Sequence, residues 1–308
     1  MKDWPLEQGR YENIMDRQRR GLPPDERPKE GPDMTAEEYE SLGNHYLQEG
    51  NMDESFVHYI KALQLNPGET RVRYKVGLLF QKKGLPDEAL KEFQEILRTD
   101  DGHALAYEGA GQAFMQMEKY YEAEKNLQKA LQFNPDLWLS HNLLGMIYDR
   151  NLRFDDAIVQ YEAAIAIRPD QDILLNNLGV SYYLNMEYSK SVETLLKAIE
   201  AGSNRKNPKI YNNLGLVLGK LGRHEEALKA FKEAGDTAAA YYNVGYIYFL
   251  QGRYEKAIAH YEKAIEMKPS FYRSANENLI KAKKALHNKG SVSSGKDEHI
   301  RNLLIHTY

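Results

Sequence analysis

Apolar residues along this chain recur with the period of an α-helix, in pairs of stretches separated by short turns. Gly or Asn residues near positions 50, 84 and 151 separate the two stretches of a pair. Within these stretches, five glycines stand 34 residues apart: Gly43, Gly77, Gly111, Gly145 and Gly179. The pattern therefore predicts a series of helical hairpins with one repeated length.

Three further positions keep a fixed distance from each glycine. An aromatic residue follows three residues later, at Tyr46, Phe80, Phe114, Tyr148 and Tyr182. A small residue follows after twelve, at Ser55, Ala89, Ala123, Ala157 and Ser191, and a bulky one after sixteen, at Tyr59, Phe93, Leu127, Tyr161 and Leu195. We interpret the glycine as the point where the two helices of a hairpin cross closely, with the small residue on the facing helix and the aromatic residue beside it.

This combination of period and residue types resembles the tetratricopeptide repeat family over residues 36–269. The resemblance implies an all-α fold: a right-handed superhelix, or solenoid, of about seven helical hairpins followed by a C-terminal capping helix. Counted from seven residues before each glycine, the expected repeats are 36–69, 70–103, 104–137, 138–171, 172–207, 208–237 and 238–269.

Two spacings depart from 34 residues. Gly179 and Gly215 are 36 apart, and the sequence AGSNRKNP between them indicates a longer turn. Gly215 and Gly245 are only 30 apart, because the sixth repeat loses its last helical turn at Gly235. Asp236 or Thr237 is expected to cap the next helix. The shortening is either a tolerated deletion or a bend that shapes the C-terminal end of the array.

The regions outside the repeats differ in composition. Residues 1–35 form an N-terminal extension that ends in a Pro-rich linker, residues 270–288 a charged capping helix, and residues 289–308 a tail expected to be flexible. Both ends carry apolar side chains at helical spacing: Tyr11, Ile14 and Met15 in one, and Ile300, Leu303, Leu304 and Tyr308 in the other. Either end docks on a partner, folds back into the groove of this protein, or is a frayed terminus.

The family resemblance implies which side chains line the concave face of the solenoid. They are those at the second, fifth, ninth and twelfth positions of each repeat, with the sixth at its edge. Asparagines recur there at Asn142, Asn176 and Asn212, with edge partners Asn177, Asn213 and Asn243. An amide both donates and accepts, so such a ladder is suited to gripping an extended peptide backbone. The alternative is that the edge asparagines bridge neighbouring repeats.

The same positions are apolar toward the C-terminus, which favours a partner site there. The apolar positions there are Val180, Tyr183, Leu216, Tyr242, Tyr246 and Phe249. Of these, Tyr183, Tyr242, Tyr246 and Phe249 are candidate peptide-binding residues, together with Met146 and Leu105 in earlier repeats. The alternative is that the capping helix or the tail covers part of this surface. A basic carboxylate clamp for chaperone C-termini is not expected, because Glu40 stands where that pattern places a lysine.

Composition narrows the class of function. The net charge is −4 with acids and bases interleaved, which argues against nucleic-acid binding and against a basic membrane patch. There are no cysteines, and the chain contains no nucleotide-binding glycine motif and no HExxH metal motif. We therefore predict no catalytic residues, no metal and no cofactor. With no signal-like or membrane-spanning stretch, we expect a cytoplasmic location.

The sequence thus predicts a non-enzymatic scaffold or adaptor that binds a peptide or helix of another protein in its concave groove. One alternative is an assembly factor of a pilus or secretion apparatus. A second is a regulatory subunit that recruits substrates for a transferase, and a third is self-association through the groove or the tails.

Overall fold

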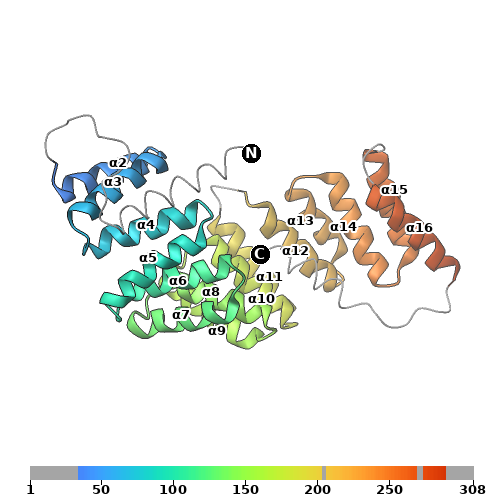
Figure 1. Cartoon of the computed structure of the whole chain (residues 1–308). Coiled ribbons are helices and arrows are strands. Elements are labelled where there is room, and N and C mark those ends of the chain that lie inside the picture. The colour runs from blue at the N-terminus through green and yellow to red at the C-terminus, as the bar shows by residue number, and fades with distance from the viewer. Residues whose placement is uncertain (1–33, 203–205, 269–272, 289–308) are drawn as a thin grey trace. The chain divides into compact units, whose positions relative to one another are not determined.

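The computed structural model describes residues 34–202, 206–268 and 273–288, and all regular structure in these ranges is α-helical (Figure 1). The helices pair into hairpins of a first and a second helix. They are α2 (Ala36–Gln48) with α3 (Met52–Leu65), α4 (Thr70–Lys82) with α5 (Pro86–Thr99), α6 (Ala104–Gln116) with α7 (Tyr120–Phe133), α8 (Trp138–Arg150) with α9 (Phe154–Ile167), α10 (Asp172–Leu184) with α11 (Tyr188–Ala201), α12 (Pro208–Lys220) with α13 (His224–Glu233), and α14 (Thr237–Leu250) with α15 (Tyr254–Met267). A last helix, α16 (Arg273–His287), packs on α15 and on α14.

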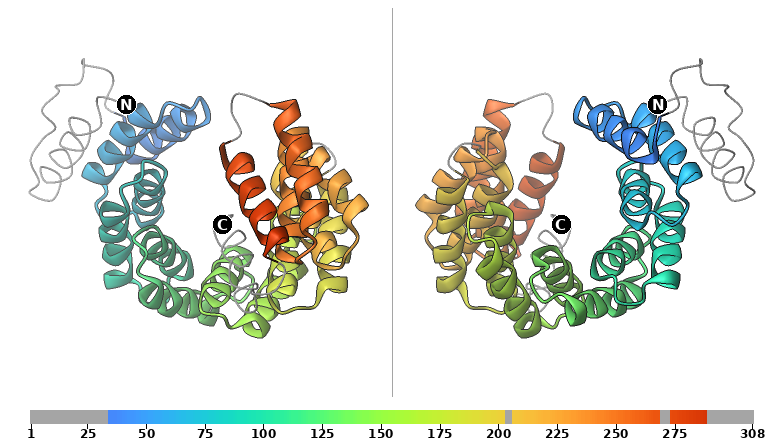
Figure 2. Two further views of the ribbon diagram at one scale, coloured as in Figure 1. Left: turned by 90° about the vertical axis from the view of Figure 1, so that its right-hand side faces the viewer. Right: turned by 90° about the vertical axis from the view of Figure 1, so that its left-hand side faces the viewer.

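The chain divides into two compact parts, residues 1–135 and 136–308. The N-terminal part contains α2 to α7 and the C-terminal part contains α8 to α16. Within each part, every hairpin packs against the next one along the chain, as Figure 2 shows. Most of the predicted N-terminal extension and the whole predicted tail lie outside the described residues.

Each hairpin is closed by a bulky side chain that lies over a glycine. A Cβ atom added to Gly145 would come within 2.6 Å of the Tyr161 ring, and one added to Gly77 within 2.5 Å of the Phe93 ring. The small residue twelve positions after the glycine is fully buried in the same contact, as Ala157 illustrates. The prediction of a close helix crossing at the glycine is confirmed, and the side chain that fills it is the one sixteen residues later.

The turn between the two helices of a hairpin always contains one residue with positive φ, seven positions after the glycine. The residue is a glycine in four repeats, such as Gly50 and Gly222, and is Glu118, Leu152 or Met186 in the other three. The three non-glycine residues have φ between 58° and 64°, which side chains tolerate in the left-handed helical region. A glycine is therefore not obligatory at this turn.

The sixth repeat is shorter, as predicted. Helix α13 has 10 residues, whereas α11 and α15 each have 14. Gly235 follows it with φ of 136°, a conformation essentially restricted to glycine, and Asp236 caps α14 by accepting hydrogen bonds from the backbone N–H groups of Ala238 and Ala239. The change of direction expected from the missing turn remains a prediction.

The seventh repeat is nevertheless joined to the short one by side-chain contacts. Gln251 donates to the backbone carbonyl of Gly219 at 3.0 Å. Arg253 Nη1 lies 3.0 Å from Nε2 of His224, whose ring packs on Tyr248 with the centroids 4.2 Å apart. Because the guanidinium can only donate, His224 Nε2 is the acceptor and the imidazole is neutral.

Replacing Gly235 by alanine should lower the free energy of unfolding by about 1–3 kcal/mol, because φ of 136° is unfavourable for any residue with a Cβ atom. Gly222→Ala is the matched control, because its φ of 77° is close to values that other repeats adopt with side chains. Urea denaturation followed by circular dichroism measures both. Equal losses in the two variants would contradict the special role of Gly235.

Lowering the pH from about 8 to about 5 should destabilise the chain, partly through His224. Burial lowers the pKa of His224, and the nearby charges of Arg253 and Lys256 lower it further. The unfolded chain therefore binds a proton at a higher pH than the folded chain does, so stability present at neutral pH is lost as the pH falls below the ordinary histidine value. The melting temperature of His224→Gln should fall less steeply with pH. His287→Gln, at an exposed position, should keep the slope of the wild type.

Candidate protein-binding face

We define the candidate binding face as the side chains at the second, fifth, sixth, ninth and twelfth positions of the seven repeats. These side chains all lie on first helices. Repeats one to three supply the face of the N-terminal part, and repeats four to seven supply that of the C-terminal part.

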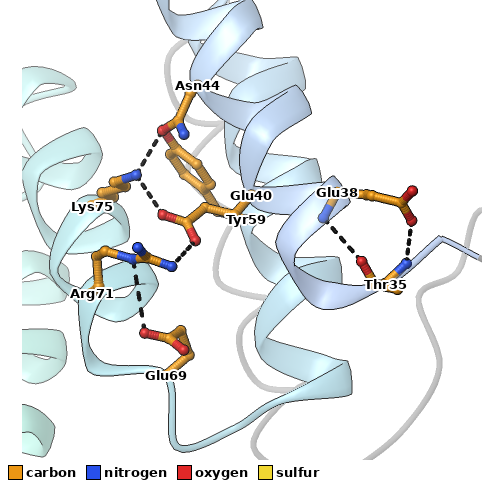
Figure 3. Close-up of polar contacts among 8 residues, drawn as sticks. All are labelled: Thr35, Glu38, Glu40, Asn44, Tyr59, Glu69, Arg71 and Lys75. Carbon is orange, nitrogen blue, oxygen red and sulfur yellow. Dashed lines mark hydrogen bonds and ion pairs between the residues drawn. The ribbon is translucent and has the colours of Figure 1, made fainter.

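In the N-terminal part, the face contains a compact cluster of charged side chains around one amide, Asn44 (Figure 3). Glu40 on α2 accepts hydrogen bonds from Arg71 at 2.7 Å and from Lys75 at 2.6 Å, both on α4. Lys75 also donates to Asn44 Oδ1 at 2.7 Å, and the Tyr59 hydroxyl donates to the same oxygen at 2.8 Å. The network thus links the first repeat to the second.

The charges of this cluster are paired within it. Glu40 is only 6% exposed and its carboxylate pairs with two cations, one of which, Arg71, also lies 3.9 Å from the carboxylate of Glu69. The buried carboxylate would be left without a partner if both cations were removed, which is unfavourable. The two basic groups that a bound acidic ligand would need are already engaged by a carboxylate of this chain.

In the C-terminal part, four asparagines form a chain of side-chain hydrogen bonds across three repeats. Asn213 Nδ2 donates to Asn176 Oδ1 at 2.8 Å, and Asn177 Nδ2 donates to Asn142 Oδ1 at 3.0 Å. A longer bond of 3.4 Å from Asn176 to Asn177 joins the two pairs. Asn142 Nδ2 in turn lies 3.8 Å from the sulfur of Met146.

These bonds divide the predicted amide ladder into two kinds of residue. Asn142, Asn177 and Asn213 are between 2% and 7% exposed, so their amides bridge repeats and are not presented to a ligand. Asn177 and Asn213 therefore bridge neighbouring repeats, which was the alternative interpretation of the edge asparagines. Asn176, Asn212 and Asn243 are half-buried, and the side chains of the last two make no hydrogen bond to a described residue.

The seventh repeat supplies an aromatic end to the face. Tyr242 and Tyr246 on α14 are half-buried and stack with an interplanar angle of 13° and centroids 6.4 Å apart. Phe249 is half-buried against Tyr254, at 5.6 Å between centroids. Helix α14 carries no charged side chain, and burial raises the pKa of both Tyr242 and Tyr246.

The remaining predicted residues differ in exposure. Tyr183 is 6% exposed and its ring packs on Tyr188, so it belongs to the core and does not lie open as expected. Its hydrophobic cluster includes Leu184 and Leu214. Met146 is half-buried beside Asn142, and Leu105 in the N-terminal part is 39% exposed.

Sequence reasoning considered bridges between repeats only for the edge asparagines, and it missed a pairing that recurs at several junctions, in which the sixth-position side chain of one repeat bonds to the fifth-position side chain of the preceding repeat. This pairing joins Lys75 to Glu40 and Asn177 to Asn142, whereas Asn243 and Asn212 do not form it. It continues into the last helix, where Asn278 Nδ2 donates to the Tyr242 hydroxyl at 2.9 Å. Aligning the two positions between successive repeats, rather than within one repeat, would have revealed it.

The described residues contain no group of three or more His, Asp or Glu side chains placed to hold a metal ion. None of the helices in the described ranges is long and apolar enough to cross a membrane.

Family models for the tetratricopeptide repeat match residues 37–69, 74–137, 153–185, 208–234 and 238–271. These matches together cover more than half of the chain, which therefore belongs to the tetratricopeptide repeat family. It is an all-α solenoid of the kind that serves as a protein-interaction scaffold. Comparison with curated proteins gives no match.

Solved structures show the same fold. A tetratricopeptide repeat protein from Parabacteroides merdae is 16% identical, with a TM-score of 0.54 over 81% of this chain and 98% of that one. PilF from Pseudomonas aeruginosa is 21% identical, with a TM-score of 0.57 over 69% of this chain and 91% of that one. MamA from Desulfovibrio magneticus is 19% identical, with a TM-score of 0.51 over 56% and 97%. At these identities the likeness is one of fold.

Replacing Asn177 by alanine should lower the free energy of unfolding by about 1–3 kcal/mol, because the buried Asn142 oxygen loses its donor. Asn243→Ala is the matched control at the same repeat position. Its side chain has no bond to a described residue to lose, so its effect should stay within about 0.5 kcal/mol. Chemical denaturation measures both variants, and a neutral Asn177→Ala would show that the bridge contributes nothing to stability.

Proposed function

We propose that this chain is a non-enzymatic scaffold that binds an extended segment or a helix of a partner protein on the candidate binding face of repeats six and seven. The observation that carries the proposal is helix α14, which is uncharged and presents Tyr242, Tyr246 and Phe249 in half-buried positions. Large aromatic side chains of this kind contribute most of the binding energy at protein interfaces.

Two neighbouring amides support the same location. Asn212 and Asn243 are half-buried, and their side-chain amides make no hydrogen bond to a described residue. Their donors and acceptors are therefore available to a ligand. An amide next to an aromatic surface can bond to the backbone of a partner segment while the rings take up its apolar side chains. Each such bond contributes about 0.5–1.5 kcal/mol, so the amides orient the segment and the rings supply most of the affinity.

The N-terminal part is less suited to this role. Arg71 and Lys75 are both paired with Glu40, and an acidic ligand would have to compete with that carboxylate before it gained contacts of its own.

Two further functions considered from the sequence have no observation that favours them. The likeness to the pilus protein PilF is one of fold at 21% identity, and it assigns no pilus or secretion role to this chain. A substrate-recruiting subunit of a transferase would use the same binding face. Identification of a transferase or its substrate as the bound partner would support that role.

Affinity capture from cells that make the protein tests the proposal. The double variant Tyr246→Ala/Phe249→Ala should recover a specific partner at least tenfold less efficiently than the wild type does, because one interface aromatic residue of this kind contributes on the order of 2 kcal/mol and about 1.4 kcal/mol corresponds to a factor of ten. Quantitative mass spectrometry measures the recovery, and circular dichroism verifies the fold of each variant.

The matched control is Val159→Ala/Leu196→Ala, which removes two apolar side chains that are 59% and 46% exposed on second helices. This control should recover the partner as the wild type does. Equal recovery by all three proteins, or equal loss in both variants, would contradict binding on the aromatic face.

A further inference from the structure

Two tyrosine rings of α14 each have two basic side chains over them. Lys232 on α13 and Lys263 on α15 place their Nζ atoms 5.0 Å from the centroid of the Tyr241 ring. Removal from water alone would raise the pKa of Tyr241, yet these two ammonium groups lower it. The His260 ring lies 6.0 Å from that of Tyr241 and 5.0 Å from that of Tyr248, so it stands between the two tyrosines.

The second ring belongs to Tyr248. The guanidinium of Arg253 lies 5.0 Å from its centroid and Nζ of Lys256 lies 5.6 Å from it. The two tyrosines hold the fourth and eleventh positions of the repeat, on a different side of α14 from the fifth, ninth and twelfth positions of the candidate binding face. We call the four exposed cations around them the basic stripe: Lys232, Arg253, Lys256 and Lys263.

Helix α15 separates its charges onto two sides. Successive residues of an α-helix advance by about 100°, so its basic residues fall within one arc of about 80° and its acidic residues within another of about 40°. The basic residues are Arg253, Lys256, His260 and Lys263, and the acidic residues are Glu255, Glu262 and Glu266. Charges that are interleaved in the sequence therefore form a surface of one sign in the structure.

None of the four cations of the basic stripe forms an ion pair with a described residue. Other basic residues of the same repeats do form such pairs, as Lys206 does with Glu233 and Lys268 with Asp236. The positive charge of the stripe is thus left without a counter-charge from the described parts of the chain.

Two other repeats supply an acid at the equivalent place. Arg153 of the fourth repeat pairs with Asp156, three residues later, at 2.7 Å. Arg223 of the sixth repeat pairs in the same way with Glu226 at 2.6 Å. The seventh repeat keeps the arginine but has Lys256 at the position of the acid. Neighbouring like charges on a helix are unfavourable, and a bound anion relieves this repulsion.

We propose that the basic stripe binds an acidic segment of a partner protein. Residues 253 and 263 are ten positions apart, so the stripe runs about 15 Å along α15. One phosphate or carboxylate group reaches only part of that length. An extended segment rises about 3.3 Å per residue, so about five of its residues lie along the stripe, and its Asp or Glu side chains pair with successive cations.

The charge of the whole chain favours a short acidic segment over a larger polyanion. A nucleic acid or an anionic membrane extends beyond the stripe and meets the acids of a chain whose net charge is −4. The stripe is separate from the candidate binding face, so this inference does not depend on the function proposed for that face.

The experiment uses the full-length chain and a fluorescein-labelled hexaglutamate peptide. Fluorescence anisotropy at about 20 mM salt should show binding that weakens as the salt is raised to about 150 mM, because exposed charges are screened. The variant Lys256→Glu/Lys263→Glu should bind the peptide at least tenfold more weakly, because it replaces two attractive charges by repulsive ones. Circular dichroism verifies the fold of each variant.

The matched control is Lys61→Glu/Lys129→Glu, which changes the net charge by the same amount. Each of these lysines holds the repeat position of Lys263 and lies over a tyrosine ring, at 5.5 Å and 5.1 Å from the centroid. The control should bind hexaglutamate as the wild type does, and so should Tyr246→Ala/Phe249→Ala. Equal loss in both charge-reversal variants, or no binding by the wild type, would overturn the proposal.

Lys256→Glu alone distinguishes binding from folding. It introduces the acid that the fourth and sixth repeats carry, so its melting temperature should equal or exceed that of the wild type. Its affinity for hexaglutamate should fall roughly threefold or more. A lower melting temperature with unchanged peptide binding would show that Lys256 serves the fold, and would remove it from the site.

Flotation with phosphatidylglycerol vesicles tests the other kind of anionic surface. The wild type should not associate with them at about 150 mM salt. Association that Lys256→Glu/Lys263→Glu abolishes, in the absence of hexaglutamate binding, would overturn the assignment of the stripe to a protein segment.

Discussion

Each hairpin of this chain depends on a bulky side chain of the second helix that lies directly over a glycine of the first helix. The glycine lets the two backbones approach until the ring of Tyr161, or its equivalent, fills the space where a Cβ atom would stand. Every repeat uses the same contact, so the two helices of each hairpin approach closely at the same repeat position. The outward-facing positions of the first helices are then free to vary in chemistry without changing the scaffold.

That freedom appears in the bonds between successive repeats. The same pair of positions holds an ion pair between Lys75 and Glu40 in the N-terminal part and a pair of amides, Asn213 and Asn176, in the C-terminal part. At the last repeat it holds an amide and a phenol, Asn278 and Tyr242. One geometry therefore supports surfaces that are charged in the first repeats and aromatic in the last.

The sequence predicted the repeats well, because the glycine spacing, the small residue and the bulky residue report directly on backbone distance. It also predicted the short α13 and the cap at Asp236. It was less informative about the face, since a repeat position does not show whether an amide points outward or toward its neighbour. Asn142 and Asn177 satisfy each other, and Tyr183 is buried, because of contacts with residues remote in sequence.

Helix α16 has a consequence for how the array can grow. It packs on α15, where the first helix of a further repeat would lie, and its Asn278 donates the hydrogen bond that a sixth-position residue would donate. No second helix follows it in the described residues. Its Ile280 side chain is 67% exposed. Helix α16 is therefore equivalent to half of an eighth repeat. A duplicated hairpin inserted before it would meet matching surfaces on both sides, so the length of this scaffold can change by gene duplication without redesign of its end.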